Sequence, residues 1–293
     1  MEMMLNPLPS RTWNRLGMNE SFIKMDAPLE NLIPSRDSSP AGVRWSENAE
    51  GWEGLQTGMG RDMGVLTADA PVCQAETGAG AVMTQPLILR YRYEDGQCSR
   101  SRLRLVAGKD SILSVIVVLE SPDLSGGISA LQTEIAAEAG ARVHLSVAQL
   151  LGSSFVCLND IGGRCEDSAR IEVTKLELGA SRLFAGTTID LAGTESDFQT
   201  DAAYHVLPEQ QVDLNYVALH DRKGGDFKNF ERRNDRRREG GDFHNNDRGE
   251  RGGYRGGDRN DRRREGGDDR KREGFNGRKS FEKKSYDRKS RKF

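Results

Sequence analysis

The sequence predicts an all-β body followed by a tail that cannot fold alone, and three observations support this. From Leu87 onward the chain reads as short β-branched runs separated by Gly, Asp and Ser, which is typical of strands and turns. Two of these runs resemble each other at an offset of 28 residues, and repeated units at such spacing favour stacked coils. After Leu219 the chain contains no Ala, Val, Ile, Leu or Met, so little apolar surface remains to offset the entropy of folding.

The first 85 residues predict a leader that is only partly ordered. They mix Pro, Gly, Ser, Met and charged residues without sustained periodicity. Their first residues also lack a basic segment followed by an apolar one, which is the pattern of a secretory signal. We therefore expect a cytoplasmic location.

The body, residues 86–220, holds most of the aliphatic and β-branched residues and is expected to form one core. Its last strand is predicted at Val212–Leu219, where apolar and polar residues alternate as in a half-buried strand. The longest apolar run, Val115–Leu119, is far shorter than the ~20 residues of a membrane helix, so no membrane partner is expected. The first strands of the body are predicted at Leu87–Tyr93, Arg102–Val106, Ile112–Leu119 and Ile128–Ile135.

The self-similar runs lie in the middle of the body. Residues 140–147 resemble residues 168–174, with Ala141 and Ala169 at equivalent positions. A β-solenoid fits this repeat, because each coil then buries its apolar face against its neighbours. An antiparallel sandwich or barrel competes with it, although such folds expect tight Asn-Gly or Asp-Gly hairpins and only Asp95-Gly96 qualifies. The pattern alone leaves both folds open.

The four cysteines show no metal-binding pattern. Cys73, Cys98, Cys157 and Cys165 are irregularly spaced, with no Cys-x-x-Cys pair among them. Structural zinc and redox dithiols usually need close pairs, because two thiolates must meet at one metal or at each other. We expect unpaired thiols in or near a core, and we assign no metal to them.

The histidines and glycine pairs of residues 1–220 carry no catalytic or nucleotide-binding motif. His144 lies between two apolar residues and is expected to face solvent or a polar groove, and neither His205 nor His220 stands in a nucleophile or metal spacing. The glycine pairs in residues 58–60 and 78–80 neither follow a predicted strand nor open a predicted helix. We therefore predict no catalytic, metal-binding or cofactor-binding residue, and a protein that is not an enzyme.

The tail, residues 221–293, has a composition typical of RNA-binding segments of the Arg-Gly-Gly type. It holds 26 Lys and Arg against 16 Asp and Glu, a net charge of +10, which leaves the preceding residues at −12. The nine residues 234–242 recur unchanged as residues 260–268, and Arg-Gly-Gly units with a tyrosine lie between them. Arginine bridges phosphates and stacks on bases, aromatic rings add stacking platforms, and glycine keeps the backbone free.

The tail is therefore predicted to be disordered in isolation and to contact RNA. Its acidic residues partly neutralise the charge that drives such binding, so a merely solubilising tail remains the alternative. The candidate nucleic-acid-binding residues are Arg236, Arg237, Arg238, Arg251, Tyr254, Arg255, Arg262, Arg263 and Arg264.

Two segments carry a resemblance to a known family. Residues 8–20, Leu-Pro-Ser-Arg-Thr-Trp-Asn-Arg-Leu-Gly-Met-Asn-Glu, resemble the N-terminal signature of SufD-like proteins in the SufB/SufD family of iron–sulfur cluster assembly scaffolds. Residues 212–220 are similar to a central β-helix strand of that family that ends in a histidine. The resemblance spans about residues 6–220 and implies a right-handed parallel β-helix.

The resemblance implies a scaffold that works with a SufB-like and a SufC-like protein. The family builds its cluster near the SufB–SufD interface with thiolates and histidines of the later β-helix, so the iron–sulfur cluster is expected only as the product of a complex. In this chain the tail follows His220 where the later coils and the SufC-contacting region are expected. The contact with SufC is thereby in doubt, and no family site residue is transferred.

These observations give two hypotheses. The first is a SufD-like scaffold, truncated and expected to be impaired in assembly, that binds no cofactor stably by itself. Its last coil is expected to have an open edge and to promote self-association. The second is an RNA-binding protein that acts through the tail, which itself resembles the basic Gly-rich extensions of some bacterial DEAD-box RNA helicases.

Overall fold

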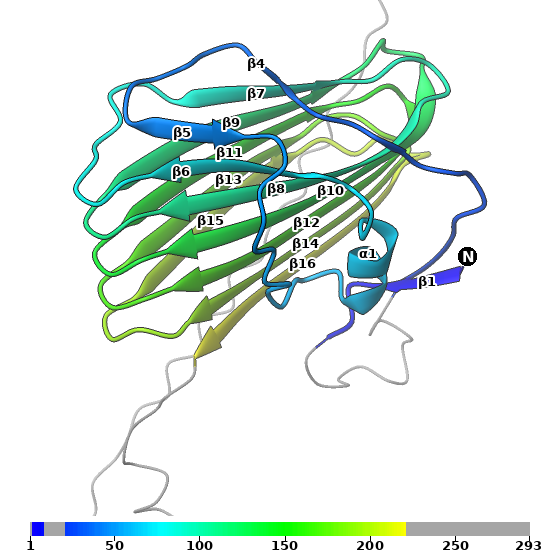
Figure 1. The fold of residues 1–293 in the computed structure, drawn as a ribbon. Coiled ribbons are helices and arrows are strands. Elements are labelled where there is room, and N and C mark those ends of the chain that lie inside the picture. The colour runs from blue at the N-terminus through cyan, green and yellow to red at the C-terminus, as the bar shows by residue number, and fades with distance from the viewer. Residues whose placement is uncertain (1, 9–20, 221–293) are drawn as a thin grey trace, which may run out of the picture. The chain divides into compact units, whose positions relative to one another are not determined.

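The computed structural model describes residues 2–8 and 21–220, and these residues form a parallel β-solenoid (Figure 1). Five coils of two strands each stack along the solenoid axis, and one further strand follows them. Residues 221–293 lie outside the described residues.

Each coil contributes one strand to each of two sheets, and every strand pairs in parallel with the equivalent strand of the next coil. The first sheet contains β6 (Val72–Thr77), β8 (Cys98–Ala107), β10 (Gly126–Ala137), β12 (Ser154–Cys165), β14 (Arg182–Leu191) and β16 (Gln211–His220). The second sheet contains β7 (Leu87–Arg92), β9 (Ile112–Glu120), β11 (Arg142–Leu150), β13 (Arg170–Glu177) and β15 (Asp197–Tyr204).

The predicted solenoid is confirmed, and the antiparallel sandwich or barrel is excluded for the body. Arg142 of β11 pairs with Arg170 of β13, which reproduces the offset of 28 residues that the sequence repeat predicts. The strands expected at Leu87–Tyr93 and Val212–Leu219 are β7 and β16, within a residue or two at each end. The turn residues between runs therefore mark the corners of coils and not hairpins.

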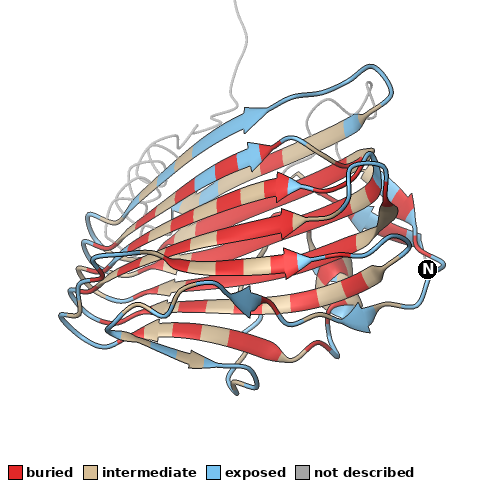
Figure 2. Ribbon diagram, turned by 90° about the horizontal axis from the view of Figure 1, so that it is seen from above, coloured by how far each residue is buried: buried red, intermediate tan, exposed pale blue. Residues whose placement is uncertain are grey.

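The interior of the solenoid is filled by stacked rows of side chains from successive coils. Figure 2 shows buried residues recurring along the strands of these coils. Strands alternate buried and more exposed residues, because successive side chains point to opposite faces of a sheet. In one row Leu105, Ile135, Gly163 and Ile189 lie in register on β8, β10, β12 and β14. A Cβ atom on Gly163 would lie 2.5 Å from Cδ1 of Ile189, so the absence of a side chain there lets the larger neighbours fill the row.

One corner of the solenoid repeats a left-handed backbone conformation in every coil. Gly80, Asp110, Gly140, Ser168 and Glu195 all have φ between 55° and 70°. The N–H of Asp110 donates to the carbonyl of the next coil's turn at 2.9 Å, and Gly140 and Ser168 repeat this bond at 2.8 Å. Glycine adopts this conformation readily, whereas other residues do so at a cost of about 1–2 kcal/mol. The bonds between coils hold the strained residues in place.

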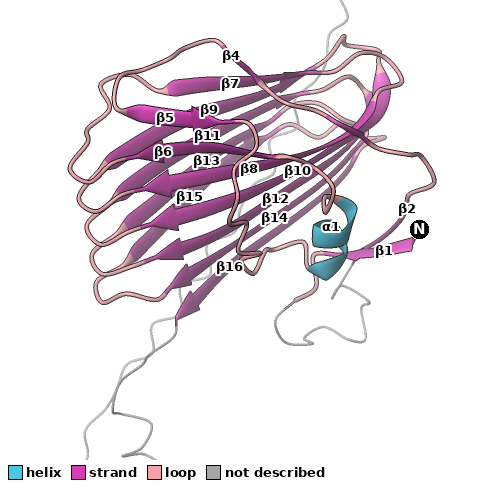
Figure 3. Ribbon diagram, viewed as in Figure 1, coloured by secondary structure: helices cyan, strands magenta, loops and turns pink. Residues whose placement is uncertain are grey.

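Residues 2–8, 21–29 and 54–66 of the leader pack onto the outer face of the first sheet, and its other short strands pair with strands of the two sheets (Figure 3). The boundary expected after residue 85 falls inside the first coil, because β6 lies before it and β7 after it. No helix of the described part is long and apolar enough to cross a membrane. The leader elements are β1 (Glu2–Leu5), β2 (Ser21–Lys24), β3 (Glu30–Asn31), β4 (Ser35–Arg36), β5 (Val43–Ser46) and α1 (Arg61–Leu66).

A second apolar cluster holds the leader on the sheet. Phe184 and Leu158 are buried although they lie on the outer face, and methionines of the leader cover them. Strands β10, β12 and β14 are consequently buried on both faces along much of their length, as their burial patterns show. The cluster consists of Met3, Leu5, Ile23, Met25, Met59, Met63, Ala130, Leu158 and Phe184.

Candidate functional site

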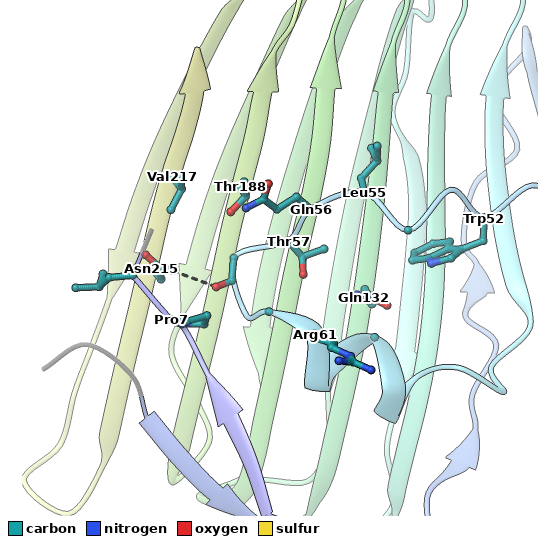
Figure 4. A pocket seen from close by; sticks show the side chains of 15 residues that line it. Pro7, Trp52, Leu55, Gln56, Thr57, Arg61, Gln132, Thr188, Asn215 and Val217 are labelled. Atoms are coloured by element: carbon teal, nitrogen blue, oxygen red, sulfur yellow. Dashed lines mark hydrogen bonds between the residues drawn. The ribbon is translucent and has the colours of Figure 1, made fainter. Parts of the chain in front are cut away.

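A cavity of about 480 Å³ lies between the outer face of the first sheet and the leader (Figure 4). Gln132, Thr188 and Asn215 line it from β10, β14 and β16. Trp52 and Arg61 line it from the leader. Its volume lies within the range of small-molecule sites, and its wall combines amides, a hydroxyl, a guanidinium group and apolar carbon.

Residues 54–60, which we call the strap, cross the sheet beside this cavity. Thr57 forms an antiparallel bridge with Gly162 of β12. The side-chain amide of Asn215 donates to the carbonyl of Gly58 at 3.0 Å, as the dashed line in Figure 4 marks. A Cβ atom on Gly186 would lie 2.5 Å from the amide nitrogen of Met59, so a side chain there would displace the strap. Glycine on the sheet therefore permits direct packing of backbone on backbone.

Asp160 on β12 is the buried carboxylate beneath the strap. Its Oδ1 accepts the backbone N–H of Met59 at 3.0 Å, and its Oδ2 accepts the side-chain amide of Gln132 at 3.4 Å. Burial raises the pKa of Asp160 to about 6. Hydrogen bonds from Thr57, Met59 and Gln132 oppose that rise, and the charge of Lys175 opposes it further.

A second group of ionisable residues lies inside the solenoid near its last coils. Lys175 of β13 donates from Nζ to Oγ1 of Thr187 at 2.9 Å and lies 5.4 Å from the centre of the Tyr216 ring. Glu177, two residues further along β13, has both carboxylate oxygens buried without a hydrogen bond. Burial lowers the pKa of Lys175 and raises that of Glu177, while the opposite charge of each partner counteracts both shifts. Attraction between the two charges therefore favours their ionised forms.

The thiols are free, and the structure places three of the four in the core. Cys73, Cys157 and Cys165 are buried and Cys98 is half-buried. Burial raises the pKa of Cys73 and of Cys165 to about 12, and it raises that of Cys157 as well. No group of three or more His, Cys, Asp or Glu side chains suited to a metal ion occurs among residues 2–8 and 21–220. Buried thiols of this kind are poor candidates for thiolate ligands.

The three histidines among the described residues lie on the surface. His144 is on the outer face of the second sheet, where its Nδ1 lies 2.6 Å from Oε2 of Glu172, in agreement with its predicted exposure. His205 and His220 are also exposed. The structure brings none of the three together with a cysteine, so it assembles no site from the histidines of the body.

The glycine pairs lie in different settings, and the tail residues lie outside the described chain. Gly58 and Gly60 belong to the strap, and Gly60 precedes α1, a six-residue helix that the sequence pattern does not predict. Gly80 lies at the left-handed corner of the first coil.

The candidate RNA-binding residues fall outside the described residues, and the structure describes no contact of theirs: Arg236, Arg237, Arg238, Arg251, Tyr254, Arg255, Arg262, Arg263 and Arg264.

The strap and Asp160 are absent from the sequence-based candidates, although one signal points to them. Gly162 and Gly186 interrupt runs that otherwise read as strands, and glycine inside a strand often marks a close approach of another backbone. The burial of Asp160 depends on the leader that covers it. A leader without periodicity gives no indication of the face on which it packs.

The solenoid is similar to a known protein domain. Residues 91–230 match the family model of the SUF system FeS cluster assembly, SufBD core domain. No curated protein matches the chain. The match covers the coils from β8 onward and supports membership of the SufB/SufD family. The SufBD core domain also supports a role in iron–sulfur cluster assembly.

Proposed function

We propose that this chain, with its SufBD core domain, acts as a SufD-like, non-enzymatic scaffold in iron–sulfur cluster assembly. The observation that carries the proposal is the coincidence of the matched residues with the parallel coils from β8 to β16. The expected partners are a SufB-like protein and a SufC-like protein. In this proposal the cluster is the product of the complex, and the chain contributes a surface on which a partner docks.

The chemistry of the thiols supports a docking role. Cysteine ligates a cluster as the thiolate, and burial raises the pKa of Cys73, Cys157 and Cys165. The thiol form is therefore strongly favoured near neutral pH, unless a metal displaces the proton. We propose that the described residues bind no cluster stably and that ligands come from a partner.

The last coil offers a surface for such a partner. Within the described residues β15 pairs only with β13, and β16 pairs only with β14. The Asp197 N–H donates to the carbonyl of Ala169, just before β13, at 2.9 Å, and the His205 N–H donates to that of Glu177 in β13 at 3.1 Å. Because alternate residues of a strand direct their N–H groups to opposite sides, those of Phe198, Thr200 and Ala202 point away from β13. A strand of the partner could pair with them.

A pull-down with a matched pair of variants tests this proposal. The full chain is immobilised and exposed to a SufB-like protein, a SufC-like protein and both together. Ala202→Pro removes an outward N–H, so it should weaken partner binding while the chain stays folded by circular dichroism. Leu124→Ala changes an exposed apolar residue in the turn after β9 and should bind like the unchanged chain. If the chain bound neither the SufB-like protein nor the SufC-like protein, the proposal would be contradicted.

RNA binding by the tail is the second candidate function, favoured by the repeated nine-residue segment with three consecutive arginines. Single-stranded RNA binding should show little sequence preference and fall steeply with salt, because phosphate neutralisation releases counterions. Deletion of residues 221–293 should remove it. Changing Arg251 and Arg255 to Lys keeps the charge, so a loss of affinity would indicate arginine-specific contacts. No binding at ~50 mM salt, where electrostatic contacts are strong, excludes this function.

A further inference from the structure

We propose that the strap, residues 54–60, is a pH-dependent cover of the outer sheet face, which lifts from the sheet when Asp160 loses its proton. The inference is independent of the assembly role. It rests on a tight backbone contact, a buried carboxylate beneath that contact and a cavity beside it.

The strap is held by few contacts, and several of them converge on Asp160. The Met59 N–H donates to its Oδ1 at 3.0 Å, and the Met59 side chain is fully buried against the outer face. Asn215 provides the other side-chain anchor, through its bond to the carbonyl of Gly58. Gly186 on the neighbouring strand leaves no room for a Cβ atom under the strap. Asp160 is fully buried in this arrangement, and in our proposal solvent reaches it when the strap moves away.

The charged groups around Asp160 leave its ionised form without an adjacent positive partner. Lys175 acts on it from the solenoid interior, but its Nζ donates a hydrogen bond to Thr187. Arg102, in the same row on β8, donates instead to Thr67 and to backbone carbonyls of the leader. The strap itself offers only the Thr57 hydroxyl and the Met59 amide, and the adjacent position on β14 is Gly186.

The Arg61 and Asp62 side chains of α1 form no hydrogen bond or ion pair with Asp160 in the described structure. Gln132 on β10 contributes a neutral amide. The ionised carboxylate is therefore stabilised mainly by hydrogen bonds and would gain hydration if it were exposed.

The direction in which pH shifts strap opening follows from the linkage between proton binding and opening. With the strap closed the pKa of Asp160 is about 6, and with the strap open the carboxyl is solvated and approaches its ordinary value of 3.8. The closed state therefore binds more protons between these two values. Closing is favoured at low pH, and opening increases as pH rises toward 6 and then levels off. For these two values the opening constant rises about tenfold between pH 5 and pH 8.

Hydrogen exchange on the full chain measures this opening directly. After correction for intrinsic exchange rates, the strap amides, Met59 above all, should show an opening constant about tenfold larger at pH 8 than at pH 5. The amides of β9 in the core serve as the internal reference and should not follow this profile. Equal opening of the strap at both pH values would overturn the proposal.

Three variants distinguish an effect of the Asp160 carboxyl from a general loosening of the strap. Asp160→Asn keeps the shape and an acceptor oxygen but cannot titrate, so the strap should lose its pH profile. Asp62→Asn removes a carboxyl of α1 that accepts the Met4 N–H, and it should keep the profile. Gly186→Ala should raise opening at every pH, since its Cβ would meet the Met59 nitrogen. A pH profile that survives in Asp160→Asn would contradict the proposal.

A titration of the unchanged chain tests the proposal even if the Asp160→Asn variant fails to fold. The carboxyl carbon of Asp160 can be followed by nuclear magnetic resonance as pH is varied. A midpoint near 6 supports the proposal, and a midpoint near 4 overturns it.

Discussion

Lys175 and Glu177 place two ionisable side chains in the interior of a solenoid that is otherwise largely apolar. Their exposed fractions are 1% and 2%, so each depends on the other's charge for electrostatic compensation. Buried pairs of this kind are often no more stable than apolar side chains of similar size, yet removal of one partner is strongly destabilising. This asymmetry gives a prediction at the scale of single residues.

Lys175→Met should lower the free energy of unfolding by about 3 kcal/mol, because Glu177 is left buried without its positive partner. The double variant Lys175→Met with Glu177→Leu should recover most of that loss. Urea unfolding followed by circular dichroism measures both. Lys109→Met, at an exposed lysine, is the control and should change little. Equal stability of Lys175→Met and the unchanged chain would show that the pair is not coupled as described.

The cysteines give the second prediction at this scale. Anaerobic reconstitution with iron and sulfide should yield no stoichiometric cluster on the isolated chain, because burial keeps Cys157 and Cys165 in the thiol form. Absorption spectra and iron counting provide the measurement. A stoichiometric cluster that disappears in Cys157→Ala or Cys165→Ala would contradict the account of these thiols.

The exposure of a single residue could be predicted from the sequence where it depends only on neighbouring residues along the same strand. The exposure of His144 follows from its strand pattern, since alternation along one strand is a local property. The burial of Asp160 and Lys175 was not predictable in this way. One depends on the leader packing over it, and the other is a lysine at an inward position where an apolar residue is normally expected.

At the scale of elements, the left-handed corner determines how one coil passes to the next. Gly140 has φ of 70°, and a Cβ atom there would lie 2.1 Å from Oδ1 of Asp110 in the preceding coil. Gly140→Ala should therefore destabilise the solenoid by about 1–2 kcal/mol, through strain and the displacement of Asp110. Thermal unfolding should show a lower midpoint.

Gly78→Ala is the matched control, because nothing lies within 4 Å of its Cβ position and its φ is not in the left-handed region. It should leave the midpoint nearly unchanged. Equal midpoints for the two variants would show that the corner conformation is not required.

The elements of the body were largely predictable, and those of the leader were not. Strands such as β9 and β16 follow from β-branched content and alternation. The short strands β3 and β4, with two residues each, owe their existence to pairing with β8 and β7. Helix α1 is six residues long, and a helix of that length depends on tertiary packing, here of Met63.

At the scale of the whole molecule, the open edge of the last coil predicts self-association. Strands β15 and β16 each have one unpaired side within the described residues, and Tyr204 and Leu207 are exposed nearby. Light scattering at tens of micromolar should detect species larger than a monomer, and Ala202→Pro should reduce them. A clean monomer of the unchanged chain at that concentration would count against an accessible edge.

The parallel pairing of the strands could not be predicted from the sequence pattern alone and is seen only in the assembled sheets. The 28-residue repeat fits a solenoid, but one weak repeat does not exclude an antiparallel arrangement. Pairing of every coil strand with its equivalent in the next coil resolves the choice, because it is a property of the assembled sheets.

Hydrogen exchange of the full chain with a SufB-like partner tests the scaffold role most directly. If the partner docks by pairing with β15, the outward amides of Phe198, Thr200 and Ala202 should gain protection in the complex, whereas the amides of β9 in the core should not change. Protection confined to β15 and its immediate neighbours is the result that this account predicts. Formation of no complex, or of a complex that leaves these three amides as exchangeable as before, would contradict it.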